Sequence, residues 1–540
     1  MNGAVLLGVS VCWFLLSYFV LGRRLEKLFG IDNRIPTPAH VLRDGVDYEP
    51  TKPAVLFGHH FASIAGAGPI VGPVLALTYG WLPAVVWILL GCVLIGAFHD
   101  FAAMFLSVRN GGRSIGSIVE KQTGYLGRQI FLLFCFAALI LVVAIFASLV
   151  AQAFIDSPPV ATASTLFIAM APVFGWLTYR RGMPLWLGTL IFVPLLFLSI
   201  WFGVVFPCPI LPKAVWIVFL LGYAAVASVI PVWMMLQPRD YLNAYLLYVM
   251  ILLGIAGVFV AVPGMQVSAF SDQAGLFFGT RKVFPLLFVT VACGACSGFH
   301  ALVSSGTSAK QISSESHILP VSYGAMLVEG VLAILAVVSV SQFSPAEMAA
   351  TPNPVSLFAK GIAVLTVKLG LPHQIGETFV ALAISAFIMT TLDTATRLAR
   401  FVWSEIWMCR NGEEPSGGIR KVLSGSLTAT SIVVLLAGIM CFSNAAGLVW
   451  PVFGASNQLL AALTLLVVSV FLYRQGRRWL PAAIAMGFML AISIWALVEL
   501  CISNFRQSLL LTGASAFLLV MAFVMVGLTV RIFRENKGNE

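Results

Sequence analysis

The chain has 540 residues, of which 60% are hydrophobic and 10% are charged, and its formal net charge is +10. Because a soluble domain has roughly 25% charged residues, this composition excludes a soluble protein and indicates an integral membrane protein. The apolar residues come in runs of about 20, the length at which an α-helix crosses the hydrocarbon core of a bilayer. The spans are therefore expected to be helices rather than barrel strands.

We predict an all-α polytopic membrane protein with about 15 transmembrane helices. Longer connections are expected at 22–53, 109–128, 264–283, 342–375 and 401–423, and none of them fits a soluble domain. The predicted helices cover residues 3–21, 54–78, 83–108, 129–153, 161–179, 184–206, 214–236, 243–263, 284–308, 319–341, 376–400, 424–443, 446–473, 480–501 and 508–531.

The first span and the loop charges predict the topology. Arg23, Arg24 and Lys27 follow the first apolar run, and no basic segment precedes it, so we expect an uncleaved anchor. With the N-terminus outside, 25 Lys and Arg residues fall on the inner side and 6 on the outer side. The positive-inside rule then predicts an odd number of spans, with the N-terminus out and the C-terminus in. The net charge is explained by topology and requires no nucleic-acid partner.

The stretch "FGHHFASIAGAGPIVGP", residues 57–73, is poorly suited to a continuous helix. Its glycines lower helix propensity and its prolines remove backbone donors, so we expect a break near the middle of the span. A broken helix leaves backbone groups that must face protein or a water-filled cavity, and its free N–H groups can hold an anion. The alternative is that the glycines allow close helix packing.

A second span has the same character. The segment "CGACSGFHALVSSGTSAK", residues 293–310, combines three glycines with small hydroxyl residues. By the charge count the two spans run in opposite directions, which is how an inverted repeat places discontinuous helices around a central site. Cys293 and Cys296 form a lone CxxC without a second ligand pair, so we expect packing residues and neither a metal site nor a bound cofactor.

Ionisable residues in several spans are predicted to form one layer in the inner half of the membrane. Buried ionisable groups are costly and typically mark ion or proton pathways, and histidine changes charge near neutral pH. The alternative for any single histidine is a neutral ring that bonds a backbone carbonyl. Glu329, near mid-membrane, is either a coupling carboxylate or a protonated structural group. The other members of the predicted proton-coupling set are His59, His60, His99, Asp100, His300 and Asp393.

The segment "ISAFIMTTLDTATRLAR" places three threonines beside Asp393. Hydroxyl and carboxylate oxygens can bind a cation or hydrogen-bond the broken helix. The commoner role of a threonine in a helix is a hydrogen bond to its own backbone. The residues of this possible cation site are Thr390, Thr391 and Thr394.

Four motifs carry a family resemblance: "FGHHFASIAGAGPIVGPVLA", "PVWMMLQPRDYLN", "CGACSGFHALVSSGTSAKQISSE" and "WPVFGASNQLLAA". Together they resemble the carbon starvation A family of bacterial inner-membrane transporters. The resemblance implies the amino acid–polyamine–organocation architecture, with two inverted five-helix repeats whose first helices are broken. We accordingly expect an anchor helix and loop at 1–53, a transporter core at 54–473 with inserted spans at 214–263, and peripheral helices at 474–540.

The resemblance also implies the function, which is uptake of peptides or pyruvate during carbon or nutrient starvation, driven by proton symport. We expect alternating access around a site between spans 54–78 and 284–308, with the substrate carboxylate on backbone N–H groups of the first break. The predicted substrate-binding residues are Ala65, Gly66, Ala67, Gly68, Ser297, Ser304, Ser305, Asn457 and Gln458.

Two other classes of function are weighed against a transporter. An intramembrane metalloenzyme would need a metal motif such as HExxH, which the sequence lacks, so we do not expect an enzyme. A membrane nutrient sensor or a channel would not concentrate its ligand. The choice between peptide and pyruvate, the coupling ion and the oligomeric state are left open by the residues.

Overall fold

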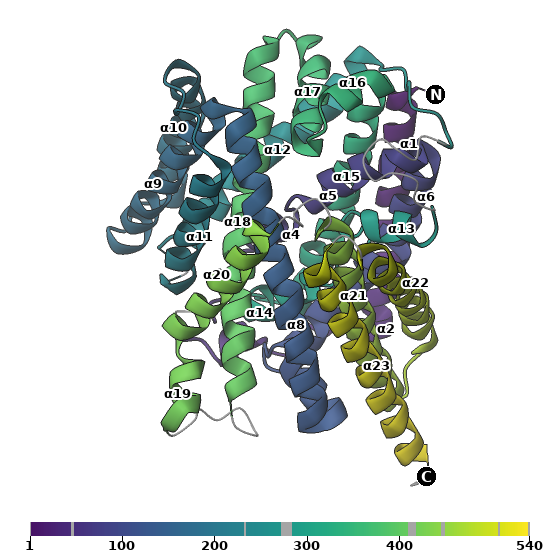
Figure 1. Ribbon diagram of the computed structural model, residues 1–540. Helices are drawn as coiled ribbons and strands as arrows, with labels where there is room; N and C mark the ends of the chain where they lie inside the picture. Colours follow the sequence, from purple (N-terminus) through teal and green to yellow (C-terminus); the bar gives the residue numbers. More distant parts are fainter. Residues whose placement is uncertain are drawn as a thin grey trace.

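The computed structural model describes residues 2–44, 48–231, 234–271, 283–408, 417–443, 449–505 and 508–537. The described chain is a bundle of helices (Figure 1). The helix α1 starts at one end of the bundle and α23 ends at the other (Figure 1). An all-helical membrane fold is thus confirmed.

The helices of the first half come in a continuous series, with short π and 3₁₀ turns between some of them. They are α1 (Gly3–Ser17), η1 (Tyr18–Gly22), α2 (Arg23–Phe29), α3 (Pro38–Val41), α4 (Pro53–Ile64), α5 (Gly68–Ala76), η2 (Leu77–Tyr79), α6 (Trp81–Gly91), η3 (Cys92–Gly96), α7 (Ala97–Arg109), α8 (Ile115–Asp156), α9 (Pro158–Arg180), α10 (Leu185–Val205), α11 (Lys213–Val229) and α12 (Leu236–Ala261).

The second half continues in the same way. Its elements are α13 (Val283–Thr290), α14 (Phe299–Gly306), η4 (Ser308–Lys310), η5 (Glu315–His317), η6 (Leu319–Gly324), α15 (Ala325–Ser341), α16 (Pro345–Ala350), α17 (Pro354–Val367), α18 (His373–Trp407), α19 (Gly418–Ser424), α20 (Ser426–Phe442), α21 (Val449–Arg474), α22 (Leu480–Asn504) and α23 (Leu509–Lys537).

The number of spans is close to the prediction. Within the described residues, 11 helices are long and apolar enough to cross a membrane, and 13 if each of two bent pairs counts as one span. The prediction of about 15 also counted 214–236 and 284–308, where the structure has the 17-residue α11 and the two eight-residue helices α13 and α14. In the expected connection 342–375 the structure has a further apolar helix, α17.

Both predicted discontinuous helices are present. The first consists of α4 and the segment Gly68–Tyr79, which are bent by 45° at the break. Pro69 stands in the first turn of α5, where a missing N–H costs no helical hydrogen bond. In the second, α13 and α14 are separated by residues 291–298, and Gly298 precedes α14. The sequence pattern of glycine and proline therefore located both breaks.

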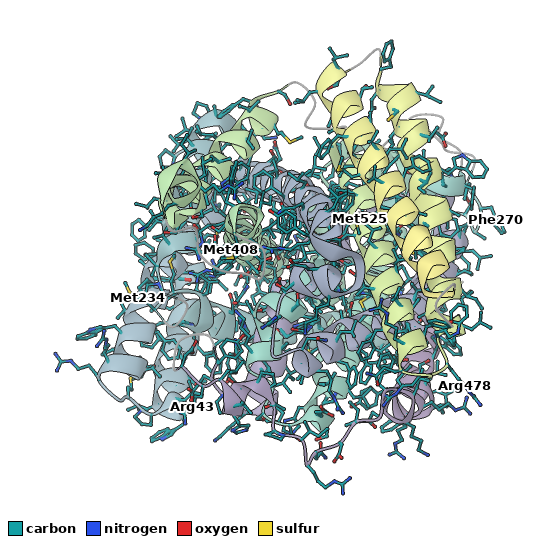
Figure 2. The ribbon with its side chains drawn as sticks, turned by 90° about the horizontal axis from the view of Figure 1, so that it is seen from below. Arg43, Met234, Phe270, Met408, Arg478 and Met525 are labelled. Atoms are coloured by element: carbon teal, nitrogen blue, oxygen red, sulfur yellow. The ribbon has the colours of Figure 1, made fainter. Side chains whose placement is uncertain are left out.

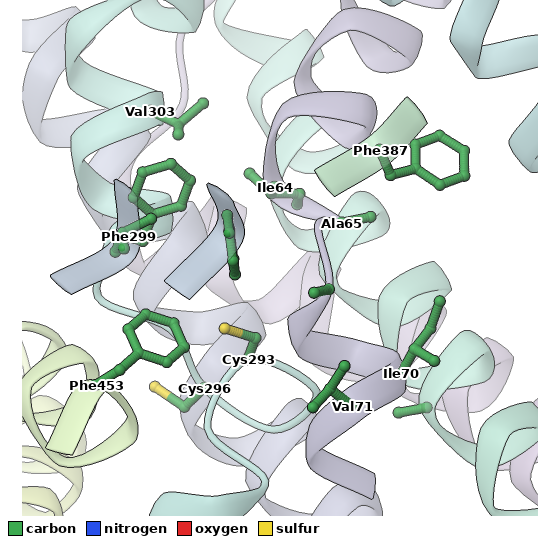
Figure 3. Packing of buried hydrophobic residues seen from close by; sticks show 14 of the residues in the cluster. Ile64, Ala65, Ile70, Val71, Cys293, Cys296, Phe299, Val303, Phe387 and Phe453 are labelled. Carbon is green, nitrogen blue, oxygen red and sulfur yellow. The ribbon is translucent and has the colours of Figure 1, made fainter. Parts of the chain in front are cut away.

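The glycines of the breaks also allow close packing, so both interpretations of them hold. A Cβ atom on Gly68 would lie 2.2 Å from Cβ of Cys293, and one on Gly66 would lie 2.5 Å from Oγ1 of Thr391. The first break thus packs directly against the second break and against α18. Figure 3 shows Cys293 between the first break, at Ala65, and Phe453 of α21. The cysteine is a packing residue, as expected.

The packing favours a different position for the inserted spans than 214–263. Helix α11 contacts α8, α18 and α20, and α20 contacts α8, α11 and α18 in return. Helix α12 packs on α4 of the first break as α21 packs on α13 and α14 of the second. From these parallel contacts we propose that α11 and α12 belong to the first repeat and that the added pair is α9–α10. This pair lies on the opposite side of the bundle from α22 and α23 (Figures 1 and 2) and exposes Trp186 and Leu190.

One residue of the charge count was assigned to the wrong environment. Arg239 was counted in an inner loop, whereas it lies near the start of α12 and is fully buried. In a sequence, an arginine beside an aspartate is typical of a loop. Here the side chains of Arg239 and Asp240 both contact buried partners. Without Arg239 the inner excess is still 24 to 6, so the topology prediction does not depend on it.

Candidate functional site

Four buried side chains form a chain of contacts beside the second break. The two carboxylate oxygens of Asp100, on α7, each contact a histidine. One lies 2.8 Å from Nδ1 of His99, and the other lies 2.7 Å from Nδ1 of His300. The second ring nitrogen of His300, Nε2, lies 3.4 Å from a carboxylate oxygen of Glu329 on α15. All four side chains are fully buried. We call these residues, His99, Asp100, His300 and Glu329, the α14 network.

This arrangement can store and pass a proton. An imidazole between two carboxylates can donate a hydrogen bond to both when it is protonated. If any one of the three groups gains or loses a proton, the charge of the site changes. His300 stands in the first turn of α14, immediately after the break. A movement of that half-helix would change its distances to Asp100 and Glu329, so the protonation of the network is linked to the conformation of the helix.

A second network lies between α4, α12 and α18. His59 Nδ1 is 3.1 Å from Asp240, and Asp240 also receives Arg239 at 3.2 Å. The guanidinium of Arg239 pairs in addition with Asp393 on α18. Tyr223 of α11 accepts from Arg239 at 2.6 Å and donates to Asp393 at 2.7 Å. We call these residues, His59, Tyr223, Arg239, Asp240 and Asp393, the α12 network.

The predicted single layer of ionisable residues is therefore divided in two. His59 belongs to the α12 network, whereas the neighbouring His60 faces Ser308 of η4, with Nδ1 2.8 Å from the hydroxyl. Adjacent positions on a helix point about 100° apart, so two consecutive histidines cannot share one set of partners. Both are buried, as the sequence predicted.

Thr390 and Thr391 of α18 bond their own helix, whereas no described residue bonds the buried hydroxyl of Thr394. Thr390 donates to the carbonyl of Ala386 at 3.0 Å, and Thr391 donates to that of Phe387 at 3.2 Å. Thr390 also accepts from the amide of Asn243 on α12 at 3.0 Å. The carboxylate of Asp393 is paired with an internal guanidinium, so the group expected to bind a cation already has one.

The amides of the first break differ in their availability. The N–H of Ala65 donates to the carbonyl of Phe61 at 2.9 Å, and that of Gly66 donates to Ile64 at 2.8 Å. Within the described residues, the N–H groups of Ala67 and Gly68 have no such bond. These two amides, at the N-terminus of α5, are the ones that can receive an anion.

Asn457 of α21 holds the second break in place. Its side-chain oxygen accepts from the backbone N–H of Phe299 at 2.8 Å, and its amide donates to the hydroxyl of Ser297 at 3.0 Å. Its own carbonyl accepts from the N–H of Gly298 at 3.1 Å. Gln458 donates to the carbonyl of Phe288 at 2.5 Å. These side chains fix the backbone around α13 and α14.

The remaining predicted hydroxyls lie on α14. Ser305 donates to Ala301 at 2.7 Å and accepts from the N–H of Ile115 at 3.3 Å, so it joins α14 to the start of α8. Ser304 is fully buried, and no described residue bonds its hydroxyl. Among the predicted substrate-binding residues, the described groups without a hydrogen-bond partner are thus the hydroxyl of Ser304, the side-chain oxygen of Gln458 and the amides of Ala67 and Gly68.

Two cavities enter the bundle along α8 and α18 from opposite ends. One, of about 850 Å³, has Lys213, Asn353 and Glu377 near its mouth and reaches Val71 on α5 and Trp450 on α21. The other, of about 810 Å³, has Tyr48 and Lys310 near its mouth and reaches Leu302 and Ser305 on α14. Each cavity therefore touches the half-helix that follows one of the breaks. We call them the α5 cavity and the α14 cavity.

The segment of α18 between the cavities is closed. The α5 cavity ends at Ala381 and the α14 cavity begins at Leu398. The intervening turns, with Thr391 and Asp393, are buried against the first break and α12. Phe453, one turn beyond Trp450, packs on Phe146 of α8 at a ring distance of 6.0 Å. The two predicted broken helices thus meet where the path is shut.

Most of the α12 network is absent from the predicted site residues. Tyr223, Arg239 and Asp240 were not predicted, and neither was Asn243, which bonds Thr390. The available signal was the motif "PVWMMLQPRDYLN", which carries the resemblance but was assigned to a short loop and an inserted span. Its Arg-Asp pair followed by an Asn one helical turn later marks one face of a helix.

Comparisons with known proteins show the family to which the chain belongs. The model of the family "Carbon starvation protein CstA" matches residues 2–356 and 341–496. A peptide transporter CstA of Campylobacter jejuni is 34% identical over 536 residues, which is 87% of this chain and 76% of that protein. A pyruvate/proton symporter BtsT of Escherichia coli is 34% identical over 586 residues, with 90% and 80% covered.

Solved structures show the same fold at low sequence identity. A mutant form of a manganese transporter from Eremococcus coleocola matches with a TM-score of 0.53 and 10% identity, and the match covers 91% of this chain and 98% of that chain. At this identity the likeness concerns the fold alone. The architecture is that of a membrane transporter with discontinuous helices.

Proposed function

Since the chain belongs to the carbon starvation protein CstA family, we propose that it is a secondary active transporter that imports peptides or pyruvate across the bacterial inner membrane by proton symport. The observation that carries the proposal is the α14 network. Asp100, His300 and Glu329 are fully buried, and one of them sits on the half-helix that follows the second break. A charge change there acts directly on an element that must move during alternating access.

The two cavities supply the substrate route. Substrate enters the α5 cavity, whose mouth carries Lys213, and passes toward the amides of Ala67 and Gly68. Its carboxylate binds at the N-terminus of α5, where the helix dipole favours negative charge. Rearrangement around the two breaks then opens the α14 cavity, whose lining carries Arg113, Arg128 and Lys310. Ser304 provides a hydroxyl for the bound substrate.

The α12 network favours a proton over a sodium ion as the coupling ion. Asp393 lies among the threonines of the predicted cation site, but it pairs with Arg239. A guanidinium remains charged at every physiological pH, so Asp393 always has a cation beside it, which it shares with Asp240. We propose that Thr390, Thr391 and Thr394 serve the structure of α18 and that protons are carried by the histidines and carboxylates.

The proposed topology has the N-terminus outside and the C-terminus in the cytoplasm. It rests on the excess of basic residues at the end that carries 22–53 and 109–128. In that orientation the α5 cavity opens to the outside and the α14 cavity to the cytoplasm, as uptake requires. The physiological setting that we propose is carbon or nutrient starvation.

The test is uptake into proteoliposomes with an imposed inward proton gradient. Accumulation of labelled pyruvate that collapses with a protonophore and resists competition by di- and tripeptides would identify a proton–pyruvate symporter. Accumulation of a labelled dipeptide under the same gradient would identify a peptide transporter. Downhill entry of either substrate without accumulation would overturn the proposal in favour of a channel, and binding without entry would favour a sensor.

The role of the α14 network is tested by Asp100→Asn, with Asp32→Asn as a matched control. The control changes a carboxylate whose partner, Arg34, lies on the surface. We expect Asp100→Asn to abolish gradient-driven accumulation and to leave insertion in the membrane intact, while Asp32→Asn behaves as the unmodified protein. Proton-driven accumulation by Asp100→Asn at the unmodified level would remove the network from the mechanism.

A further inference from the structure

A third cavity, of about 680 Å³, lies between α4, α9 and α12 and belongs to neither part of the substrate route. Its lining includes Gly58 and His59 of α4, Phe174 and Thr178 of α9, and a series of tyrosines on α12. The tyrosines are Tyr241, Tyr245 and Tyr248. We call it the tyrosine cavity.

The tyrosine cavity opens at the same end of the molecule as the α14 cavity. Tyr48 and Lys310 line the α14 cavity, while Glu49 and Gln311, the next residues of each segment, line the tyrosine cavity. Between them the two segments are joined, since the N–H of Thr51 donates to the carbonyl of Gln311 at 3.1 Å. Two separate openings therefore lie on either side of one strip of backbone.

The contents of the two openings differ. The α14 cavity is lined by none of the residues of the two buried networks. The tyrosine cavity includes His59, whose side chain is 10% exposed and whose Nδ1 contacts Asp240 of the α12 network. Its Nε2 is buried, and no described residue bonds it. His59 is thus a point at which a buried ionisable network meets a cavity.

The walls of the tyrosine cavity can support a chain of hydrogen bonds. The hydroxyls of Thr189 and Tyr241 are 2.7 Å apart, and those of Tyr241 and Tyr245 are 2.9 Å apart. Hydroxyls both donate and accept, so they can continue a line of water molecules without binding an ion. The charged residues that line the cavity are Glu49 and Arg180, which have opposite signs.

We propose that the coupling proton crosses the cytoplasmic end of the protein through the tyrosine cavity, by way of His59, while the substrate leaves through the α14 cavity. The proposal rests on the proposed proton-coupled function and adds a separate route for the ion. Before the step, Asp240 is protonated and the neutral ring of His59 carries its proton on Nε2. The Asp240 proton passes to Nδ1, and the Nε2 proton leaves to water once a rotation of the ring turns this buried atom toward the cavity. The ring is again neutral, with its proton now on Nδ1, and Asp240 is charged and paired with Arg239.

The test separates net transport from exchange. Ala244 is a buried lining residue of the tyrosine cavity that packs against Gly58 of α4, and Ala244→Phe would place a ring at this wall of the cavity. Exchange of labelled for unlabelled substrate at equal pH needs no proton release, whereas gradient-driven accumulation does. We expect Ala244→Phe to lower accumulation and substrate-evoked proton entry at least tenfold while exchange stays within twofold of the unmodified protein. The matched variant Ser117→Phe, in the α14 cavity, should lower both activities together.

A second variant allows the same cavity to be blocked after the protein has folded. Ala54→Cys places a thiol at an exposed lining position, and a bulky thiol reagent is added to the purified protein before reconstitution. The unmodified chain with its native cysteines, treated identically, is the control. The expected result is again loss of accumulation with retained exchange.

The outcomes distinguish this inference from the proposed function. An unmodified protein whose uptake ignores the proton gradient would overturn the proposed function itself. An unmodified protein that is proton-driven, together with blocked variants that accumulate substrate normally, would overturn the tyrosine-cavity route alone. Equal loss of exchange and accumulation in the labelled Ala54→Cys protein would also overturn it, because the cavity would then serve the substrate.

Discussion

Removing Arg239 should destabilise the protein more than removing either of its carboxylate partners. Arg239 is fully buried and contacts both Asp240 and Asp393. Arg239→Gln leaves two buried carboxylates without a cation, and breaking a buried ion pair by removing one partner costs about 3–5 kcal/mol. Asp393→Asn leaves Arg239 paired with Asp240 at 3.2 Å, so the loss is closer to one charged hydrogen bond, about 1.5–3 kcal/mol.

The double variant Arg239→Gln/Asp393→Asn adds a sharper expectation. It removes one of the two carboxylates that the single Arg239→Gln variant leaves unpaired, so it should be more stable than that variant. The coupling free energy of the cycle should be about 1–3 kcal/mol, the range for residues in one ion-pair network. Two independent changes would give no coupling.

The free energy of unfolding can be measured in mixed detergent and dodecyl sulfate micelles, with the fluorescence of the 13 tryptophans as the signal. Arg34→Gln is the control, because the Arg34 side chain is 90% exposed and its ion pair with Asp32 is a surface one; no measurable change is expected. Equal destabilisation by Arg239→Gln and Asp393→Asn, or an additive double variant, would refute the argument that Arg239 is the shared cation of the α12 network.

Three further predictions concern the breaks and the periphery. Gly66→Ala should abolish proteoliposome uptake, because its Cβ would lie 2.5 Å from the Thr391 hydroxyl. The double variant Gly66→Ala/Thr391→Ala should recover part of the uptake, and no recovery would contradict the steric cause. Asn457→Ala should lower the free energy of unfolding by about 1–3 kcal/mol through the unpaired N–H of Phe299, measured as above, and an unchanged value would show that the clamp is dispensable. Trp186→Ala, on the exposed face of α10, should leave proteoliposome uptake within twofold, and a larger loss would argue against a peripheral α9–α10 pair.

The sequence was sufficient for the breaks because their signals are local. Glycine and proline at 66–73, and glycines around 293–298, act on the backbone at their own positions, and the structure has both interruptions there. The buried state of the ionisable residues was predictable for the same reason, since each lies in an apolar run. The pairing of Asp100 with His300 required a contact across 200 positions, and only the shared depth in the membrane indicated it.

The failures have one physical origin. Arg239 and Asp240 are polar residues at the start of a helix, and a single sequence assigns such residues to a loop because burial of a charge is costly without a partner. Their partners are His59 and Asp393, from helices α4 and α18. The same omission bears on the predicted insertion at 214–263, because the packing of α12 on α4 is not visible along the chain.

The two breaks and the two networks together suggest how a proton controls the path. The α5 half-helix touches the cavity at one end and the α14 half-helix touches the cavity at the other, and the breaks pack against each other at Gly68 and Cys293. Gly68 is the first residue of α5, so α5 cannot move without disturbing that contact. On α4, His59 faces the α12 network and His60 faces Ser308 just beyond α14. We propose that α4, which contacts the α12 network through His59 and the segment just after α14 through His60, links proton release from the α12 network to the position of α14, which is the coupling that symport requires.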